Sequence, residues 1–236
     1  MISKRTVCLL VLGGSLLIGY AFGCGEGNGL PVLGHVASYW PLHPGDTWNY
    51  TVTHAGTTTT DAAQQVVGAM TILHAESVLP VQQSEDGTPT ATLYMAVAPL
   101  GGWQIVETDS FSPVAGTNFF RTPLQIPDSL RPGVPSTQQT PCQGTGAGAN
   151  ASTATLTITL QRDTQTVTVP AGTFTGCIQV ITMQKVLDSA GNPISYGHGS
   201  TRTLYLAPQF GAVKVTDDTG ETLELTSATV NGTSIP

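Results

Sequence analysis

Hydrophobic and polar residues alternate with a period of two along several segments of this chain. In Thr153–Gln161 every second residue is apolar, and threonines fill most of the positions between. Such a pattern over nine residues predicts a β-strand with one buried and one solvent-facing side. Thr47–Thr53 repeats the pattern with the larger residues Trp48, Tyr50 and Val52. Both segments are therefore expected to be strands at the edge of an apolar core.

Similar short patterns recur along the rest of the chain, separated by Gly, Pro or Asp clusters. They are Gln64–Val67, Met70–Leu79, Thr90–Ala98, Trp103–Thr108, Gln165–Val169, Thr175–Leu187, Thr201–Ala207, Ala212–Thr216 and Thr222–Val230. Asn118–Thr140 is proline-rich and expected to be extended, and no window shows the spacing of a long amphipathic helix. The short connections favour antiparallel pairing. We therefore expect an all-β fold, a strongly curved antiparallel sheet in the form of a half-barrel or sandwich of about ten strands.

The N-terminus has the layout of a secretory signal. Lys4 and Arg5 precede an uncharged apolar run from Thr6 to Ile18, which is too short to span a membrane. Small residues follow, and residues 21–23 resemble the lipobox that precedes the lipidated cysteine of bacterial lipoproteins. The resemblance implies that Cys24 becomes a lipidated N-terminus, although Ala21 and Phe22 depart from the usual Leu and small residue. Ordinary cleavage near Gly23, leaving an unmodified cysteine, is the alternative.

These features divide the chain into three parts. Residues 1–23 are the expected signal peptide, residues 24–38 a flexible glycine-containing tether, and residues 39–236 a single β-rich domain. The expected location is the bacterial cell envelope, with a membrane contact through the N-terminal lipid. Gly25 after the anchoring cysteine resembles the sorting rule for the outer membrane or cell surface in a host with two membranes.

The charge balance limits the partners. Of eight Lys and Arg residues two lie in the leader, so residues 24–236 carry six basic and fifteen acidic residues, a formal net charge of −9. Nucleic-acid binding and docking on anionic lipids both depend on clustered Lys and Arg. We therefore expect no nucleic-acid partner.

Two cysteines remain in the body of the chain, Cys142 and Cys177. In an oxidising envelope the simplest prediction is one disulfide between them, and two unrelated buried thiols are the alternative. A metal shared by the two sulfurs is disfavoured, because neither has a second ligand two to four residues away.

Catalytic and metal motifs are weak. Asp217-Asp218-Thr219-Gly220 contains the Asp-Thr-Gly of aspartic proteases, but no second copy exists, and the residues suit a hairpin turn. His198 and Ser200, separated by Gly199, lie in a glycine-rich loop without a nucleophile elbow. The five histidines show no short ligand spacing, so we predict no metal site, no cofactor and no enzymatic activity.

Three short motifs resemble a group of uncharacterised bacterial envelope lipoproteins. They have the forms P-L-x-x-G-x-x-W-x-Y, V-P-A-G-T-F and a late A-P-x-x-G-x-V-K, and we expect their residues to shape the fold. These residues are Pro41, Leu42, Gly45, Trp48, Tyr50, Pro170, Gly172, Phe174 and Gly211. The resemblance implies a curved sheet, with a fold-level likeness to the half-barrels of lipoprotein carriers.

Three functions are compatible with these observations. The favoured one is a non-catalytic envelope lipoprotein that binds an apolar ligand or an envelope protein in the hollow of its sheet. The second is a structural or assembly component with a solid core and no cavity. The third is a secreted hydrolase that uses Asp217, Asp218 and His198.

Overall fold

The structure is a computed structural model that describes residues 36–57, 59–99, 101–111, 115–146, 151–194 and 201–236. These residues form one short helix, α1, and 14 strands. The bounds are α1 (Val36–Tyr39), β1 (Thr47–Thr53), β2 (Thr60–Val67), β3 (Thr71–Leu73), β4 (Glu76–Glu85), β5 (Thr88–Val97), β6 (Gly102–Ser110), β7 (Gly116–Pro127), β8 (Ser136–Gly146), β9 (Ala151–Val169), β10 (Gly172–Asp188), β11 (Thr201–Ala207), β12 (Gly211–Asp217), β13 (Thr222–Val230) and β14 (Thr233–Ile235). The expected all-β class is confirmed.

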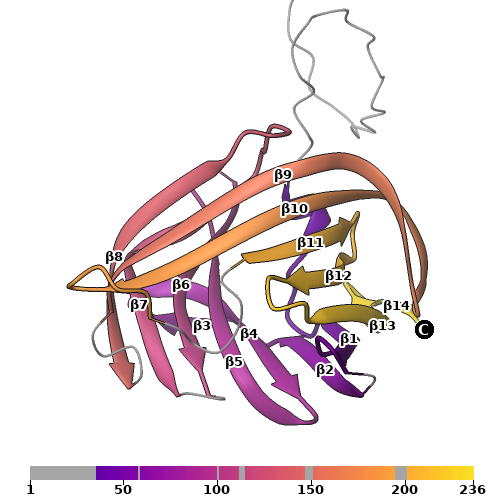
Figure 1. Cartoon of the computed structure of the whole chain (residues 1–236), viewed down its shortest axis with the longest axis horizontal. Coiled ribbons are helices and arrows are strands. Elements are labelled where there is room, and N and C mark those ends of the chain that lie inside the picture. The colour runs from indigo at the N-terminus through magenta and orange to yellow at the C-terminus, as the bar shows by residue number, and fades with distance from the viewer. Residues whose placement is uncertain (1–35, 58, 100, 112–114, 147–150, 195–200) are drawn as a thin grey trace, which may run out of the picture.

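The strands form a closed antiparallel barrel (Figure 1). Apart from β3, each strand from β1 to β12 pairs with the next strand along the chain. β13 pairs back with β1, so that 12 strands make the ring. The short strands β3 and β14 pair with β4 and β13 and lie outside this circuit. The predicted half-barrel or sandwich of about ten strands was therefore wrong. The closing contact joins Thr47 to Thr229, and no local pattern reveals a pairing over that separation.

The apolar positions of the alternating patterns line the inside of the barrel. On β1 the side chains of Trp48, Tyr50 and Val52 are buried. On β9 the four apolar residues of the predicted strand are also buried, and the threonines between them are less so. The hydrophobic effect therefore selects the register, because a one-residue slip would turn each apolar set outward.

Strand boundaries differ from the predicted ones where the chain bends, because the sequence pattern predicted two separate strands on either side of a bend. β9 is one strand of 19 residues and pairs with the equally curved β10, and the two form the longest ribbons of Figure 1. Register shifts around Cys177 place β-bulges in β10, which allow the pair to bend without ending. The proline-rich segment from Asn118 contains most of β7 and the start of β8.

The predicted single strand Met70–Leu79 is interrupted by a tight turn. His74 and Ala75 both have positive φ, of 50° and 67°, and they separate β3 from β4. A positive φ is uncommon for residues that carry a side chain, although histidine adopts it more often than most. Here the His74 ring lies 4.0 Å from the ring of Phe119, measured between centroids.

One end of the barrel is crossed by the segment 38–42. The carbonyl of Ser38 accepts a hydrogen bond from the backbone N–H of Gln209, between β11 and β12, at 2.8 Å. The carbonyl of Trp40 accepts one from the indole N–H of Trp103 on β6, at 2.9 Å. Because β6 and β12 lie on opposite sides of the 12-strand ring, the segment spans this end and closes it.

Candidate functional site

The barrel encloses a cavity of about 980 Å³. Its walls are mostly apolar and come from strands all around the ring, among them Tyr50, Leu93, Met95, Ile105, Ile158 and Leu204. Trp40, from the crossing segment, lines it as well. This volume is at the upper end of the range of small-molecule sites, about 300–1,000 Å³.

Charged residues line the cavity away from the crossing segment. Arg202 on β11 and Asp217 on β12 are directly paired, and both line the cavity. Glu85 and Glu221 line it too. The cavity therefore has an apolar interior and a charged mouth.

The strand register places a histidine and two carboxylates at this mouth. Val52 on β1 points inward and pairs with Asp61 on β2, so Asp61 lies on the inner face as well. His54 follows two residues after Val52 and continues the same face. On the other side Val52 pairs with Leu223, and Glu221 precedes that residue by two.

A third carboxylate comes from β4. Ala63 on β2 pairs with Tyr50 on one side and with Glu85 on the other, so Glu85 shares the inner face. Residues from β2, β4 and the connections after β1 and β12 thus contribute one side chain each to the same place. We call His54, Asp61, Glu85 and Glu221 the mouth cluster.

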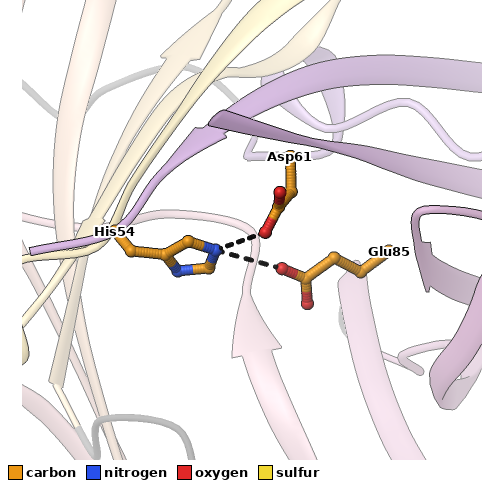
Figure 2. A group of neighbouring side chains, drawn as sticks. All are labelled: His54, Asp61 and Glu85. Atoms are coloured by element: carbon orange, nitrogen blue, oxygen red, sulfur yellow. Dashed lines mark hydrogen bonds and ion pairs between the residues drawn. The ribbon is translucent and has the colours of Figure 1, made fainter. Parts of the chain in front are cut away.

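The imidazole of His54 is at the centre of the mouth cluster. Its Nε2 atom lies 2.7 Å from Asp61 Oδ2 and 3.5 Å from Glu85 Oε1. Figure 2 shows both carboxylates directed at this nitrogen. Its Nδ1 atom lies 3.1 Å from Glu221 Oε2. All four side chains are partly exposed, between 23% and 37%. Each ring nitrogen therefore faces at least one carboxylate at a water-accessible mouth.

The surroundings of His54 favour its charged form. The hydrogen bond to Asp61 is the largest influence and raises the pKa of the imidazole, partial desolvation opposes it, and Glu221 adds to the rise. None of the four members is a nucleophilic hydroxyl or thiol. The mouth cluster can hold a proton or bind a cation.

Sequence reasoning missed the mouth cluster. We predicted no metal site because the histidines lack short ligand spacing, yet His54 meets its neighbours across β2, β4 and the β12–β13 turn. One signal in the sequence could have indicated the inward position of His54. If the alternation of Thr47–Thr53 is extended by one residue, His54 falls on the same face as Tyr50 and Val52.

Asp217 ends β12 and Asp218 begins the hairpin turn that follows it, where the sequence predicted a turn. The Asp217 Oδ1 atom accepts hydrogen bonds from the backbone N–H groups of Thr219 and Glu221, at 2.9 and 3.0 Å. Asp218 Oδ2 accepts one from the N–H of Thr201, at 3.1 Å. The Asp217 carboxylate thus supports the turn between β12 and β13, and the Asp218 carboxylate ties that turn to the start of β11. His198, the third residue of the hydrolase hypothesis, lies outside the described residues.

The predicted disulfide is absent, because Cys142 and Cys177 are both free buried thiols. Cys142 follows Pro141, which pairs with Thr153 near the start of β9, whereas Cys177 pairs with Gln165 near its end. Twelve residues of β9 separate these positions, roughly 40 Å along the strand. A disulfide needs Cα atoms within about 7 Å, so the structure corrects this prediction.

The early motif residues fix the closed end of the barrel. Leu42 is buried, and Gly45 has a φ of 91° in the turn before β1. Asp46, beside it, is almost fully buried, and its carboxylate accepts hydrogen bonds from the N–H groups of His43 at 2.8 Å and Asn231 at 2.7 Å. Pro41 lies within the crossing segment, shortly before this turn.

The middle motif forms the tip of the β9–β10 hairpin, where a bend was expected. Pro170 and Ala171 connect Val169 to Gly172, which has a φ of 132°. The N–H of Ala171 donates a hydrogen bond to the carbonyl of Leu225 on β13, at 2.9 Å. The hairpin tip therefore docks against β13, and Phe174 packs on the edge of Phe210 with ring centroids 5.9 Å apart.

Cys24, the predicted lipidation site, lies outside the described residues together with the expected signal peptide and most of the tether. Among the described residues no helix is long and apolar enough to cross a bilayer.

No protein-family model matches this chain, and no curated protein does. Two solved structures resemble it. One is a proposed exported protein with a YmcC-like fold from Bacteroides fragilis NCTC 9343, with 13% identity, 80% of this chain and 97% of that chain covered, and a TM-score of 0.41. The other is a proposed lipoprotein from Parabacteroides distasonis ATCC 8503, with 12% identity, the same coverage and a TM-score of 0.43.

Proposed function

We propose that this protein is an exported cell-envelope lipoprotein, anchored through Cys24, whose barrel binds an apolar molecule without transforming it. The observation that carries the proposal is the apolar cavity of about 980 Å³ inside a closed barrel. A barrel interior of this kind is a common ligand site, because closed strands hold the walls apart and side chains supply an apolar lining.

The distribution of polarity defines the ligand class. The walls are apolar around the ring, and charged groups gather at the mouth. An elongated molecule with an apolar body and a polar end fits this gradient, since its body leaves water and its polar end does not. The alternative of a structural component with a solid core does not account for the cavity.

Among the residues that the structure describes, the hydrolase alternative finds no support at the mouth. The carboxylate of Asp217 accepts hydrogen bonds from the N–H of Thr219 and Glu221, so it is committed to the turn. Anchoring and envelope location rest on the sequence, from the leader and from Cys24.

Binding of a fluorescent apolar probe to the full-length protein in mild detergent tests the proposal. Ala63 faces the cavity, and its neighbour Ala62 is exposed on the outer face. Ala63→Trp should block the cavity and weaken probe binding by at least about tenfold, whereas Ala62→Trp should leave it unchanged. Equal binding by both variants, or none by the wild type, would contradict the proposed function.

A further inference from the structure

The mouth cluster has the composition of a metal-binding site. Imidazole nitrogen and carboxylate oxygen are the usual non-thiolate ligands of Zn²⁺. His54, Asp61 and Glu85 each offer one such atom, and the three atoms lie within 4.8 Å of one another. His54 directly follows β1, Asp61 lies on β2 and Glu85 ends β4, and the barrel ladder holds these strands in fixed register.

The two separations measured from His54 are close to the spacing of metal ligands. Ligands about 2.1 Å from a tetrahedral Zn²⁺ are about 3.4 Å from each other. His54 Nε2 lies 2.7 Å from Asp61 Oδ2 and 3.5 Å from Glu85 Oε1 (Figure 2). Only a small shift of the Asp61 carboxylate would bring that pair to the ligand spacing. All three side chains are partly exposed, so an ion can enter from water.

Glu221 supplies a second and independent feature. Metal-binding histidines nearly always donate the N–H of their other ring nitrogen to a carboxylate or carbonyl, which fixes the tautomer. Glu221 Oε2 lies 3.1 Å from His54 Nδ1, on the side of the ring opposite Asp61 and Glu85. With the proton on Nδ1 and shared with Glu221, the lone pair of Nε2 is directed at the two remaining carboxylates.

The charge balance also favours a cation. In the described part of the chain, the ion pairs recorded for Asp61, Glu85 and Glu221 all go to His54. The mouth cluster therefore gathers three carboxylates around one imidazole. A divalent cation among them would offset part of this local negative charge.

We propose that His54, Asp61 and Glu85 bind one divalent transition-metal ion, best matched to Zn²⁺, at the mouth of the barrel, with Glu221 orienting the imidazole. Three protein ligands leave the fourth tetrahedral position for water. Metal binding at this site does not require the apolar ligand, so each of the two proposals can be tested without the other.

Zinc titration of the chelator-treated full-length protein, followed by calorimetry and by metal analysis after dialysis, tests the site. The protein should carry no histidine tag. One equivalent should bind, His54→Gln and Asp61→Asn should each weaken binding by at least about 100-fold, and Glu221→Gln by about 10- to 100-fold. His74→Gln is the matched control: His74 Nε2 lies 2.8 Å from Glu107 Oε2, a histidine–carboxylate pair away from the mouth cluster, and binding should not change.

Two further measurements keep the result unambiguous. Circular dichroism of each variant establishes that it is folded, and only folded variants are compared. Co²⁺ in place of Zn²⁺ reports the ligands, since thiolate ligation by Cys142 or Cys177 would give an intense near-ultraviolet charge-transfer band. A Co²⁺ spectrum without that band supports the site. The band, the absence of Zn²⁺ binding, or undiminished binding by His54→Gln would overturn it.

Discussion

Trp48 and Gly211, 163 positions apart in sequence, are in contact at the closed end of the barrel. The indole Nε1 of Trp48 donates a hydrogen bond to the carbonyl of Phe210, at 2.5 Å. A Cβ atom on Gly211 would lie 3.5 Å from Nε1, and Gly211 has a φ of 82°. The early and late sequence motifs are therefore two halves of one packing contact that joins β1 to β12.

Trp48→Phe should destabilise the protein by about 2–3 kcal/mol. The change leaves the Phe210 carbonyl without its donor and opens a void at a fully buried position. Urea unfolding followed by circular dichroism measures it. Trp40→Phe serves as the control, because that side chain is only half-buried, and it should cost less than about 1 kcal/mol. Equal effects of the two changes would contradict the role given to Trp48.

Gly211→Ala should cost about 1–2 kcal/mol in the same measurement. An alanine fits the space beside Trp48 without a close contact, so the cost comes from holding a Cβ-bearing residue at positive φ. An unchanged urea midpoint would show that the backbone relaxes at this turn.

Cys142 and Cys177 should resist alkylation in the native protein. Both are buried, and burial raises the pKa of both thiols, which lowers the reactive thiolate fraction. Both should react in denaturant without any reductant. Mass mapping of alkylated peptides checks this, and peptides that stay unlabelled until a reductant is added would instead show a disulfide.

The stability contribution of Asp217 should depend on pH. Burial opposes ionisation of its carboxyl, but hydrogen bonds from Thr219 and Glu221 and the charge of Arg202 outweigh burial and lower its pKa. Its stabilisation is therefore present above the unfolded pKa of 3.8 and is lost as pH falls through the lower folded value. Asp217→Asn should be less stable than the wild type at pH 7, and the two should converge in strong acid. A difference that stays constant with pH would contradict this assignment.

Cys24→Ser should release the protein from membranes. If the N-terminal cysteine carries the lipid, fractionation should move the variant from the membrane pellet to the soluble fraction, because a serine cannot accept the thioether-linked lipid. Cys142→Ser is the control and should stay membrane-bound when it is folded. Unchanged partitioning of the Cys24 variant would contradict the anchor.

The strands themselves were predictable from sequence, whereas their closure was not. The alternation in Thr47–Thr53 and Thr153–Gln161 correctly identified the buried faces of β1 and β9. Alternation is a local property, so it contains no information on which strand pairs with β1 at the far end of the chain. Bulges near Cys177 also bend β10. The period-two pattern of the sequence does not distinguish such a bend from the end of a strand.

The candidate site was less predictable, for a related reason. His54 was known to follow a strand, but Asp61, Glu85 and Glu221 become its neighbours only through the register of three pairings around the ring. The disulfide prediction was wrong because it assumed a contact that the fold does not make. It rested only on the presence of two cysteines in one domain, and the length of β9 keeps them apart.

Native mass spectrometry of the full-length protein, purified in mild detergent from its own envelope, tests the central claim most directly. If the barrel holds an apolar molecule in the cavity of about 980 Å³, the wild type should carry one additional mass that organic solvent removes and that Ala63→Trp lacks. A ligand-free mass in every preparation, or the same adduct on Ala63→Trp, would contradict the claim.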